Sequence, residues 1–139
     1  MVLGTAQLGM DYGIANISGK PNKSEVFNIL NLAWKNGVRR FDTAPDYGSE
    51  VLLGEFISAH GIQDEIIVLT KIPAIKRGVD FEKTIKAGLE LSLKNLCCPI
   101  EVLFFHNSID SELLLDFPDF FENILKDYIV SSLGVSVYE

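Results

Sequence analysis

The sequence is poor in residues that cross-link chains, bind metals or carry positive charge. Only two cysteines and two histidines occur among 139 residues. The cysteines, Cys97 and Cys98, are adjacent, a spacing that suits neither a disulfide between them nor a metal site, so we interpret them as reduced structural thiols. Twelve basic residues are outnumbered by 19 acidic ones, which gives a formal net charge of −7. This balance argues against a nucleic-acid surface, and we expect no nucleic-acid partner.

Long apolar runs are also missing from the sequence. No run approaches the length of a membrane span, and Met1-Val2-Leu3-Gly4 has no charged leader ahead of an apolar segment. We therefore expect a soluble, cytoplasmic protein with no membrane partner. Hydrophobic residues make up 47% of the chain and charged residues 22%, which is typical of a globular domain with a core. Without a visible linker, residues 1–139 are expected to form one structural unit.

Short apolar runs alternate with longer stretches of helical period, a pattern that predicts βα units and a parallel sheet. We expect strands at Val2–Ala6, Val38–Phe41, Ile66–Leu69, Val102–Phe105 and Ser131–Val135. The predicted fold class is therefore α/β, of the (β/α)8 TIM-barrel type. A complete barrel needs about 250 residues, so this chain accounts for about the first four and a half βα units.

Capping residues mark where the helices between these strands should begin. Asn22 followed by Glu25 predicts a capping box, and Asp80 predicts the start of a later helix. Ser49 is expected to cap another helix with its side chain. Pro118 should lie in the first turn of the last helix, where its missing N–H group is tolerated.

Polar side chains follow three of the expected strands directly. Asp42, Lys71 and His106 stand at these strand ends, and Tyr47 lies in the loop after Asp42. In parallel barrels, active sites lie on the face formed by the carboxyl ends of the strands. Singly, each residue has an ordinary structural explanation: a loop cap, a solvated charge, a hydrogen-bonded loop histidine or a turn aromatic. In combination they predict a functional site.

The four residue types suit the reduction of a carbonyl group. A lysine at the mouth of a barrel core needs an acid beside it, and Asp42 on the neighbouring strand is available to Lys71. A nearby ammonium lowers the pKa of a phenol from about 10, so Tyr47 becomes a usable general acid. No side chain supplies a hydride, so a nicotinamide cofactor must do so.

The order of these motifs resembles the aldo-keto reductase family, and the resemblance covers the whole chain. The motifs are Leu3-Gly4-Thr5-Ala6, Phe41-Asp42-Thr43-Ala44 with Tyr47-Gly48 and Ser49-Glu50, Thr70-Lys71, Phe105-His106-Asn107 and Gly134-Val135-Ser136. The opening segment is most similar to a bacterial subgroup whose members often act in sugar-nucleotide and surface-polysaccharide pathways.

The resemblance implies specific roles for the strand-end residues. Tyr47 protonates the carbonyl oxygen, Lys71 and Asp42 tune its acidity, and His106 orients the carbonyl by hydrogen bonding. The implied substrate is a small aldehyde or ketone, with keto sugars among the candidates, and the implied cofactor is NADPH, with NADH left open. The implied cofactor-binding residues are Gly4, Thr5, Ala6, Asp42 and Ser136.

Two positions depart from the family pattern, and two other functions stay open. Ala6 stands where the family often has a bulky aromatic residue, and Val137 stands where it usually has an asparagine. One alternative is a non-catalytic barrel relative that serves as a binding or regulatory subunit. The other is an unrelated barrel enzyme such as a sugar isomerase or hydrolase, which would require paired carboxylates or metal ligands at strand ends. We expect no metal, because Lys71 would add positive charge to any site built from Asp42, Asp46 and His106.

Half a barrel leaves two open sheet edges and an uncovered inner layer. Such edges pair readily with other strands, and exposed apolar surface promotes association. We therefore expect the isolated chain either to associate with itself or to occur within a longer polypeptide. We also expect the 139-residue chain to be inactive alone, since it ends before the loops that hold the cofactor's adenosine in the family it resembles.

Overall fold

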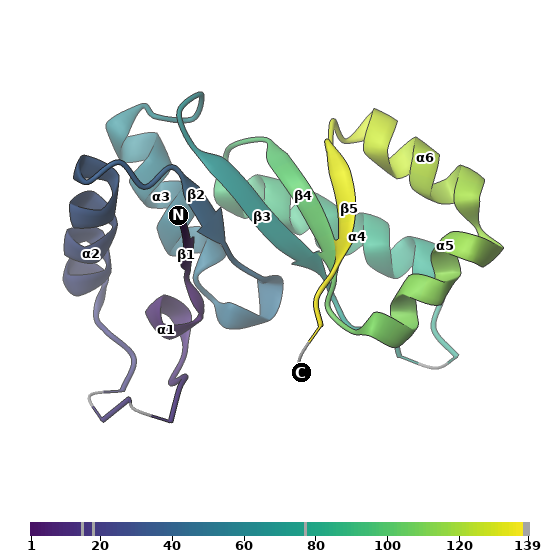
Figure 1. The fold of residues 1–139 in the computed structure, drawn as a ribbon, viewed down its shortest axis with the longest axis horizontal. Coiled ribbons are helices and arrows are strands. Elements are labelled where there is room, and N and C mark those ends of the chain that lie inside the picture. The colour runs from purple at the N-terminus through teal and green to yellow at the C-terminus, as the bar shows by residue number, and fades with distance from the viewer. Residues whose placement is uncertain (15, 18, 77, 138–139) are drawn as a thin grey trace.

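A computed structural model describes residues 1–14, 16–17, 19–76 and 78–137. A five-stranded parallel sheet forms the centre, with the strands in sequence order and β1 and β5 at its edges. The helices lie behind this sheet and along its two ends, so one face of the sheet is left without helices (Figure 1). The strands are β1 (Val2–Gly4), β2 (Arg40–Asp42), β3 (Ile67–Ile72), β4 (Ile100–Phe105) and β5 (Ser132–Val135).

The connections between the strands contain four longer helices and several short ones. The longer helices are α2 (Lys23–Lys35), α3 (Glu50–His60), α4 (Phe81–Leu96) and α6 (Pro118–Asp127). The short ones are α1 (Ala6–Gly9), η1 (Pro45–Tyr47), η2 (Ser108–Glu112) and α5 (Leu113–Asp116).

Three of the four predicted helix starts have the predicted geometry. Asn22 and Glu25 form a complete capping box at α2, Asp80 accepts a hydrogen bond from the backbone of α4, and Pro118 lies in the first turn of α6. Ser49 occupies the N-cap position of α3 as predicted, but its side chain makes no cap hydrogen bond. Its hydroxyl is bonded within the protein interior instead, so long-range packing overrides the local preference.

The chain also differs from the predicted element boundaries. The first strand ends at Gly4 rather than Ala6, because residues 6–9 turn into α1 and bury Leu8. The second strand is Arg40–Asp42 rather than residues 38–41. Between β4 and α6 the chain forms the short helices η2 and α5, which were not predicted because the sequence there has no clear helical period.

Side chains of the central strands alternate between a buried face and an open face. Phe41, Val68 and Leu103 are almost fully buried and face the helices. Their strand neighbours Leu69 and Val102 are only half-buried and face the opposite side, as the two-residue period of a strand requires. Burying each large apolar side chain contributes about 1.5–3 kcal/mol. The helix side therefore holds the core, while the other face stays accessible.

Because all five strands are parallel, their carboxyl ends lie at the same end of the sheet. Asp42 pairs with Gly4 on one side and Leu69 on the other, and Lys71 pairs with Phe104. His106 follows β4 directly at the same end. The register thus places the predicted polar residues at neighbouring strand ends.

Candidate active site

An ion pair between β2 and β3 forms the centre of the site. Lys71 Nζ lies 2.6 Å from Asp42 Oδ1 and 2.9 Å from the backbone oxygen of Thr43. The lysine side chain is 5% exposed, and the aspartate is 33% exposed. Two of the three N–H groups of the ammonium are thus directed at oxygen acceptors, which fixes its position at the strand end.

Tyr47 lies over this pair in the turn that follows β2. The 3-10 helix Pro45–Tyr47 ends at Gly48, whose positive φ of 71° favours glycine. Lys71 Nζ is 4.9 Å from the centre of the Tyr47 ring, within the range of a cation–π contact. The structure therefore brings Asp42, Tyr47 and Lys71 together, while their chemical roles stay predictions.

Buried hydroxyl groups anchor the turn from below. The Ser49 hydroxyl lies 2.9 Å from Thr5 Oγ1 and 3.1 Å from Thr43 Oγ1, and Thr5 also donates to the backbone oxygen of Asp42. All three hydroxyl residues are buried. This network joins the ends of β1 and β2 to the start of α3. It holds the Asp42 backbone in place.

Gly9 packs directly against the Tyr47 turn. A Cβ atom built on Gly9 would lie 2.0 Å from the Tyr47 backbone oxygen and 2.5 Å from the Ser49 nitrogen. No side chain fits in that space, so α1 and the turn touch through their backbones. The short helix α1 therefore supports the turn that carries Tyr47.

Glu50 is a buried acid that belongs to one of the sequence motifs but had no predicted role. It is 2% exposed, and its Oε1 accepts a hydrogen bond from Thr70 Oγ1 at 2.7 Å. Asn95 Nδ2 lies 3.5 Å from the other carboxylate oxygen. An acid in the first turn of a helix is usually exposed and interacts with the helix dipole. Its burial depends on partners 20 and 45 residues away, which no local pattern reveals.

His106 lies beside a second part of the site, at the ends of β4 and β5. Its Nδ1 atom is buried and has no hydrogen-bond partner among the described residues. A cavity of about 570 Å³ adjoins it. The cavity is lined by Ile75, His106, Asn107, Ser108, Ile109, Asp110, Ser136 and Val137. The backbone N–H of Ser136 donates to the oxygen of Phe105 at 3.0 Å, which holds Ser136 next to this strand end.

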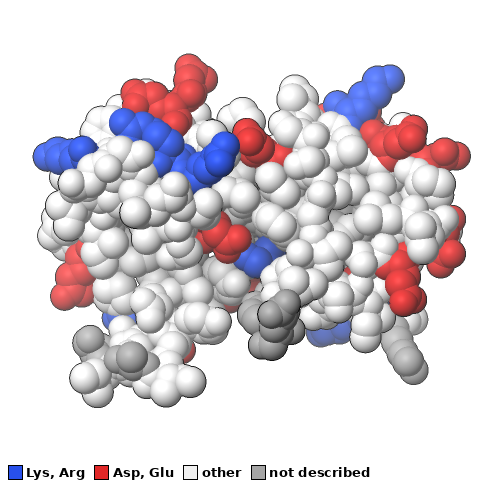
Figure 2. Space-filling model, in the orientation of Figure 1, with Lys and Arg blue, Asp and Glu red and all other residues white. Residues whose placement is uncertain are grey.

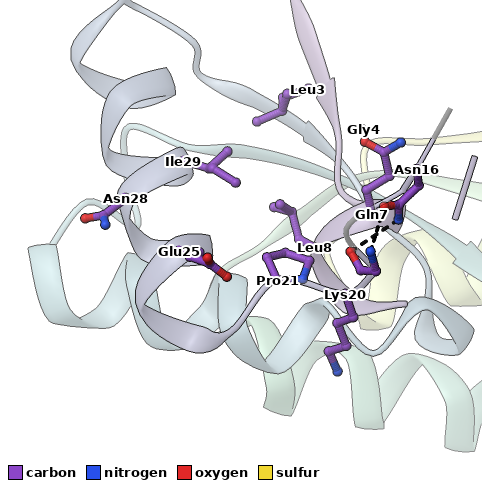
Figure 3. A pocket seen from close by; sticks show the side chains of 11 residues that line it. Leu3, Gly4, Gln7, Leu8, Asn16, Lys20, Pro21, Glu25, Asn28 and Ile29 are labelled. Carbon is purple, nitrogen blue, oxygen red and sulfur yellow. Dashed lines mark hydrogen bonds between the residues drawn. The ribbon is translucent and has the colours of Figure 1, made fainter. Parts of the chain in front are cut away.

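The predicted cofactor residues near the start of the chain lie in a different environment. Gly4 lines a cavity of about 690 Å³ between β1, α1 and α2, whereas Thr5 is buried. Figure 3 shows Gln7 and Leu8 facing this cavity from one side and Ile29 from the other. Ala6 begins α1 and is half-buried. This cavity borders the open β1 edge and is built from residues other than those of the ion pair.

Surface charge and hydropathy add two general observations. On the face shown in Figure 2, most of the surface is uncharged, basic side chains form a strip at the upper left beside acidic ones, and acidic side chains lie mainly along the right-hand rim. Among the described residues, no helix is both long and apolar enough to cross a membrane.

The aldo/keto reductase family model matches residues 1–139. The chain belongs to the aldo/keto reductase family. Among curated proteins, it is 36% identical over 80 residues to D-threo-aldose 1-dehydrogenase of a Pseudomonas species, a match that covers 53% of this chain and 24% of the relative. It is also 36% identical over 67 residues to an aldo-keto reductase of Mycobacterium avium, a match that covers 48% of this chain and 22% of the relative.

Solved structures of relatives extend the match to nearly the whole chain. A candidate aldo-keto reductase from Pseudomonas aeruginosa superposes with a TM-score of 0.77 at 28% identity, over 97% of this chain and 54% of that one. The aldo/keto reductase of Brucella melitensis gives a TM-score of 0.70 at 25% identity, over 99% and 49%. The predicted α/β fold of TIM-barrel type is confirmed. This chain spans about half the length of these structures.

Proposed function

We propose that the protein is an NAD(P)H-dependent oxidoreductase that reduces an aldehyde or ketone to an alcohol. The observation that carries this proposal is the contact of Lys71 with both Asp42 and the Tyr47 ring at the strand-end face. A buried ammonium beside a phenol is the arrangement that a tyrosine general acid needs. Family membership supports the reaction class.

In the proposed reaction, the residues of this chain deliver and stabilise the proton. Tyr47 donates its phenolic proton to the carbonyl oxygen and so forms the new O–H bond of the alcohol, while the C=O bond becomes single only as a hydride adds to the carbon. The phenolate left on Tyr47 is stabilised by the Lys71 ammonium, which Asp42 holds in place, until water restores the proton. His106 orients the carbonyl oxygen with a ring N–H.

The proposed cofactor is NADPH, with NADH as the alternative, and the residues present fit the nicotinamide end. When bound, the cofactor supplies the hydride that reaches the carbonyl carbon. The unpartnered Nδ1 of His106 and the Ser136 position offer polar groups on one cavity. We assign Ser136 to the carboxamide, and Gly4, Thr5, Ala6 and Asp42 to the same end of the cofactor.

The substrate class we propose is a small sugar or aldehyde. One curated relative carries the name D-threo-aldose 1-dehydrogenase, which supports this class. Residues 1–139 are proposed to form the N-terminal half of one barrel.

Replacement of Tyr47 tests this function. Tyr47→Phe deletes only the proton donor, so carbonyl reduction should fall about a hundred- to ten-thousand-fold while cofactor affinity stays nearly unchanged. The assay follows NADPH oxidation with a panel of aldehydes and sugars, and NADPH fluorescence reports binding. The assays use a complete version of the enzyme, in which a second half-barrel follows residues 1–139, because the 139-residue chain is expected to be inactive alone.

Two results would contradict the proposal. Equal turnover by Tyr47→Phe and wild type would remove Tyr47 as the acid. Cofactor binding without reduction of any carbonyl by the wild type would favour the alternative of a non-catalytic binding or regulatory subunit.

A further inference from the structure

The buried carboxylate of Glu50 has no part in the proposed reaction. It is the first residue of α3, and both of its oxygens face donors, Thr70 Oγ1 at 2.7 Å and Asn95 Nδ2 at 3.5 Å. The first distance is that of a strong, charge-assisted hydrogen bond, and the second is at the limit of a weak one. Acids are rarely this buried without partners, because the desolvation of a carboxylate is costly.

The Glu50–Thr70 bond joins two residues that are close in sequence to Tyr47 and Lys71. Tyr47 precedes Glu50 by three residues, and Thr70 directly precedes Lys71. Adjacent residues in a strand point to opposite faces, so Thr70 faces the helices while Lys71 faces the site. The bond thus joins the segment that carries the phenol to the segment that carries the ammonium.

We propose that Glu50 is a positioning residue, whose bond to Thr70 fixes the Tyr47 turn relative to Lys71. The inference rests on the proposed function. Apolar side chains would hold α3 on the sheet at least as well as a buried acid. They would not fix a distance, whereas a short hydrogen bond is directional and does so. Displacement of a reacting group by about 1 Å is enough to slow a reaction about a hundredfold.

The decisive variant replaces both partners by apolar side chains of similar shape, Glu50→Met with Thr70→Val. Removing both partners leaves no unpaired buried group between them, so the fold should persist. We expect kcat for carbonyl reduction to fall about tenfold or more, with KM and the cofactor Kd within about twofold of the wild type. The single variant Thr70→Ser keeps the hydroxyl donor, and its kcat should equal that of the wild type.

A matched control removes an exposed acid from the same helix. Glu55→Gln breaks only the Lys23–Glu55 surface pair, and its kcat should equal that of the wild type. Amide hydrogen exchange adds a readout that does not depend on activity. In the double variant, exchange should accelerate at residues 43–50 and stay unchanged in the core of α4.

The outcomes separate this inference from the proposed function. A folded double variant with wild-type kcat and wild-type exchange at residues 43–50 would overturn the inference, and so would an equal loss of kcat in Thr70→Ser. If the double variant does not fold, the single variant Thr70→Val is subjected to the same measurements. If the complete wild-type enzyme reduces no carbonyl, the proposed function fails. Exchange at residues 43–50 then decides whether the bond orders the Tyr47 turn.

Discussion

The Tyr47 side and the His106 side of the strand-end face differ in how their polar groups are satisfied. On the Tyr47 side, Lys71 has two oxygen acceptors and a ring contact, and the turn beneath is bonded through Ser49 and Glu50. On the His106 side, the buried Nδ1 has no partner among the described residues, and the residue itself lines a cavity. The polar groups of one side are satisfied by contacts within the chain, whereas the other side contains a buried polar atom without a partner among the described residues.

This difference makes a testable distinction between the two sides. Changes on the Tyr47 side should affect both the reaction and the stability of the fold. Changes on the His106 side should affect the reaction alone.

Lys71→Met should have the largest effect. Without the ammonium, the Tyr47 phenolate loses its stabilising charge, and we expect kcat to fall about a thousandfold. Asp42 would lose its partner, so the free energy of unfolding should fall by about 2 kcal/mol, less than for a fully buried pair because the aspartate is partly exposed. Steady-state kinetics and urea unfolding measure the two effects. Lys76→Met, at an exposed position, is the control, and equal behaviour of the two variants would contradict the account.

His106→Gln should reduce activity without loss of stability. The amide of glutamine cannot place its N–H where the imidazole ring does, and loss of one positioned hydrogen-bond donor to a developing oxyanion typically costs about a hundredfold or more in kcat. The free energy of unfolding should stay within about 0.5 kcal/mol of the wild type, because the ring nitrogen has no partner to lose. The matched control is His60→Gln, whose ring contacts the Phe56 backbone oxygen at the end of α3. A loss of stability in His106→Gln alone would erase the contrast between the two sides.

Gly9→Ala should have an intermediate effect through the Tyr47 turn. The added Cβ would collide with the Tyr47 backbone oxygen, so the turn or α1 must move. Overpacking of this kind costs about 1–3 kcal/mol, and we expect kcat to fall about tenfold. Wild-type kinetics together with wild-type thermal stability would show that the turn tolerates displacement.

The smallest effect concerns the adjacent cysteines, which have no role in the proposed reaction. Burial, with a further contribution from Cys97, raises the pKa of the Cys98 thiol from about 9 to about 11. The folded state therefore holds the thiol proton more tightly than the unfolded state does. The protonated thiol contributes fully to the free energy of unfolding below about pH 9, and this contribution is lost as the pH rises toward 11. Cys98→Ala should flatten the fall in unfolding free energy across this range. At pH 8, a thiol reagent should modify the exposed Cys97 first.

The sequence predicted those features that depend on local patterns. Alternating apolar runs indicated the five strands, and strand order placed Asp42, Lys71 and His106 at one edge. The capping box at Asn22 and the cap at Asp80 are likewise local, because donor and acceptor lie three residues apart.

Features that depend on distant partners could not be predicted. Ser49 is of a residue type that often caps helices with its side chain, yet its hydroxyl is bonded to Thr5 and Thr43. Glu50 lies in the first turn of α3, where acids are usually exposed, yet it is buried and bonded to Thr70 and Asn95. In both cases the deciding contact arises only when separate βα units pack together, and a single sequence carries no signal for it.

The central proposal is that Tyr47 gives its proton to a carbonyl at this face, with the hydride supplied by a bound nicotinamide cofactor. Its most direct test is a single turnover with NADPH that carries deuterium at the transferable C4 position, followed by mass analysis of the alcohol. The account predicts one deuterium on the carbinol carbon with the wild type, and formation at least about a hundredfold slower with Tyr47→Phe. An alcohol without deuterium, or equal rates for the two proteins, would contradict it.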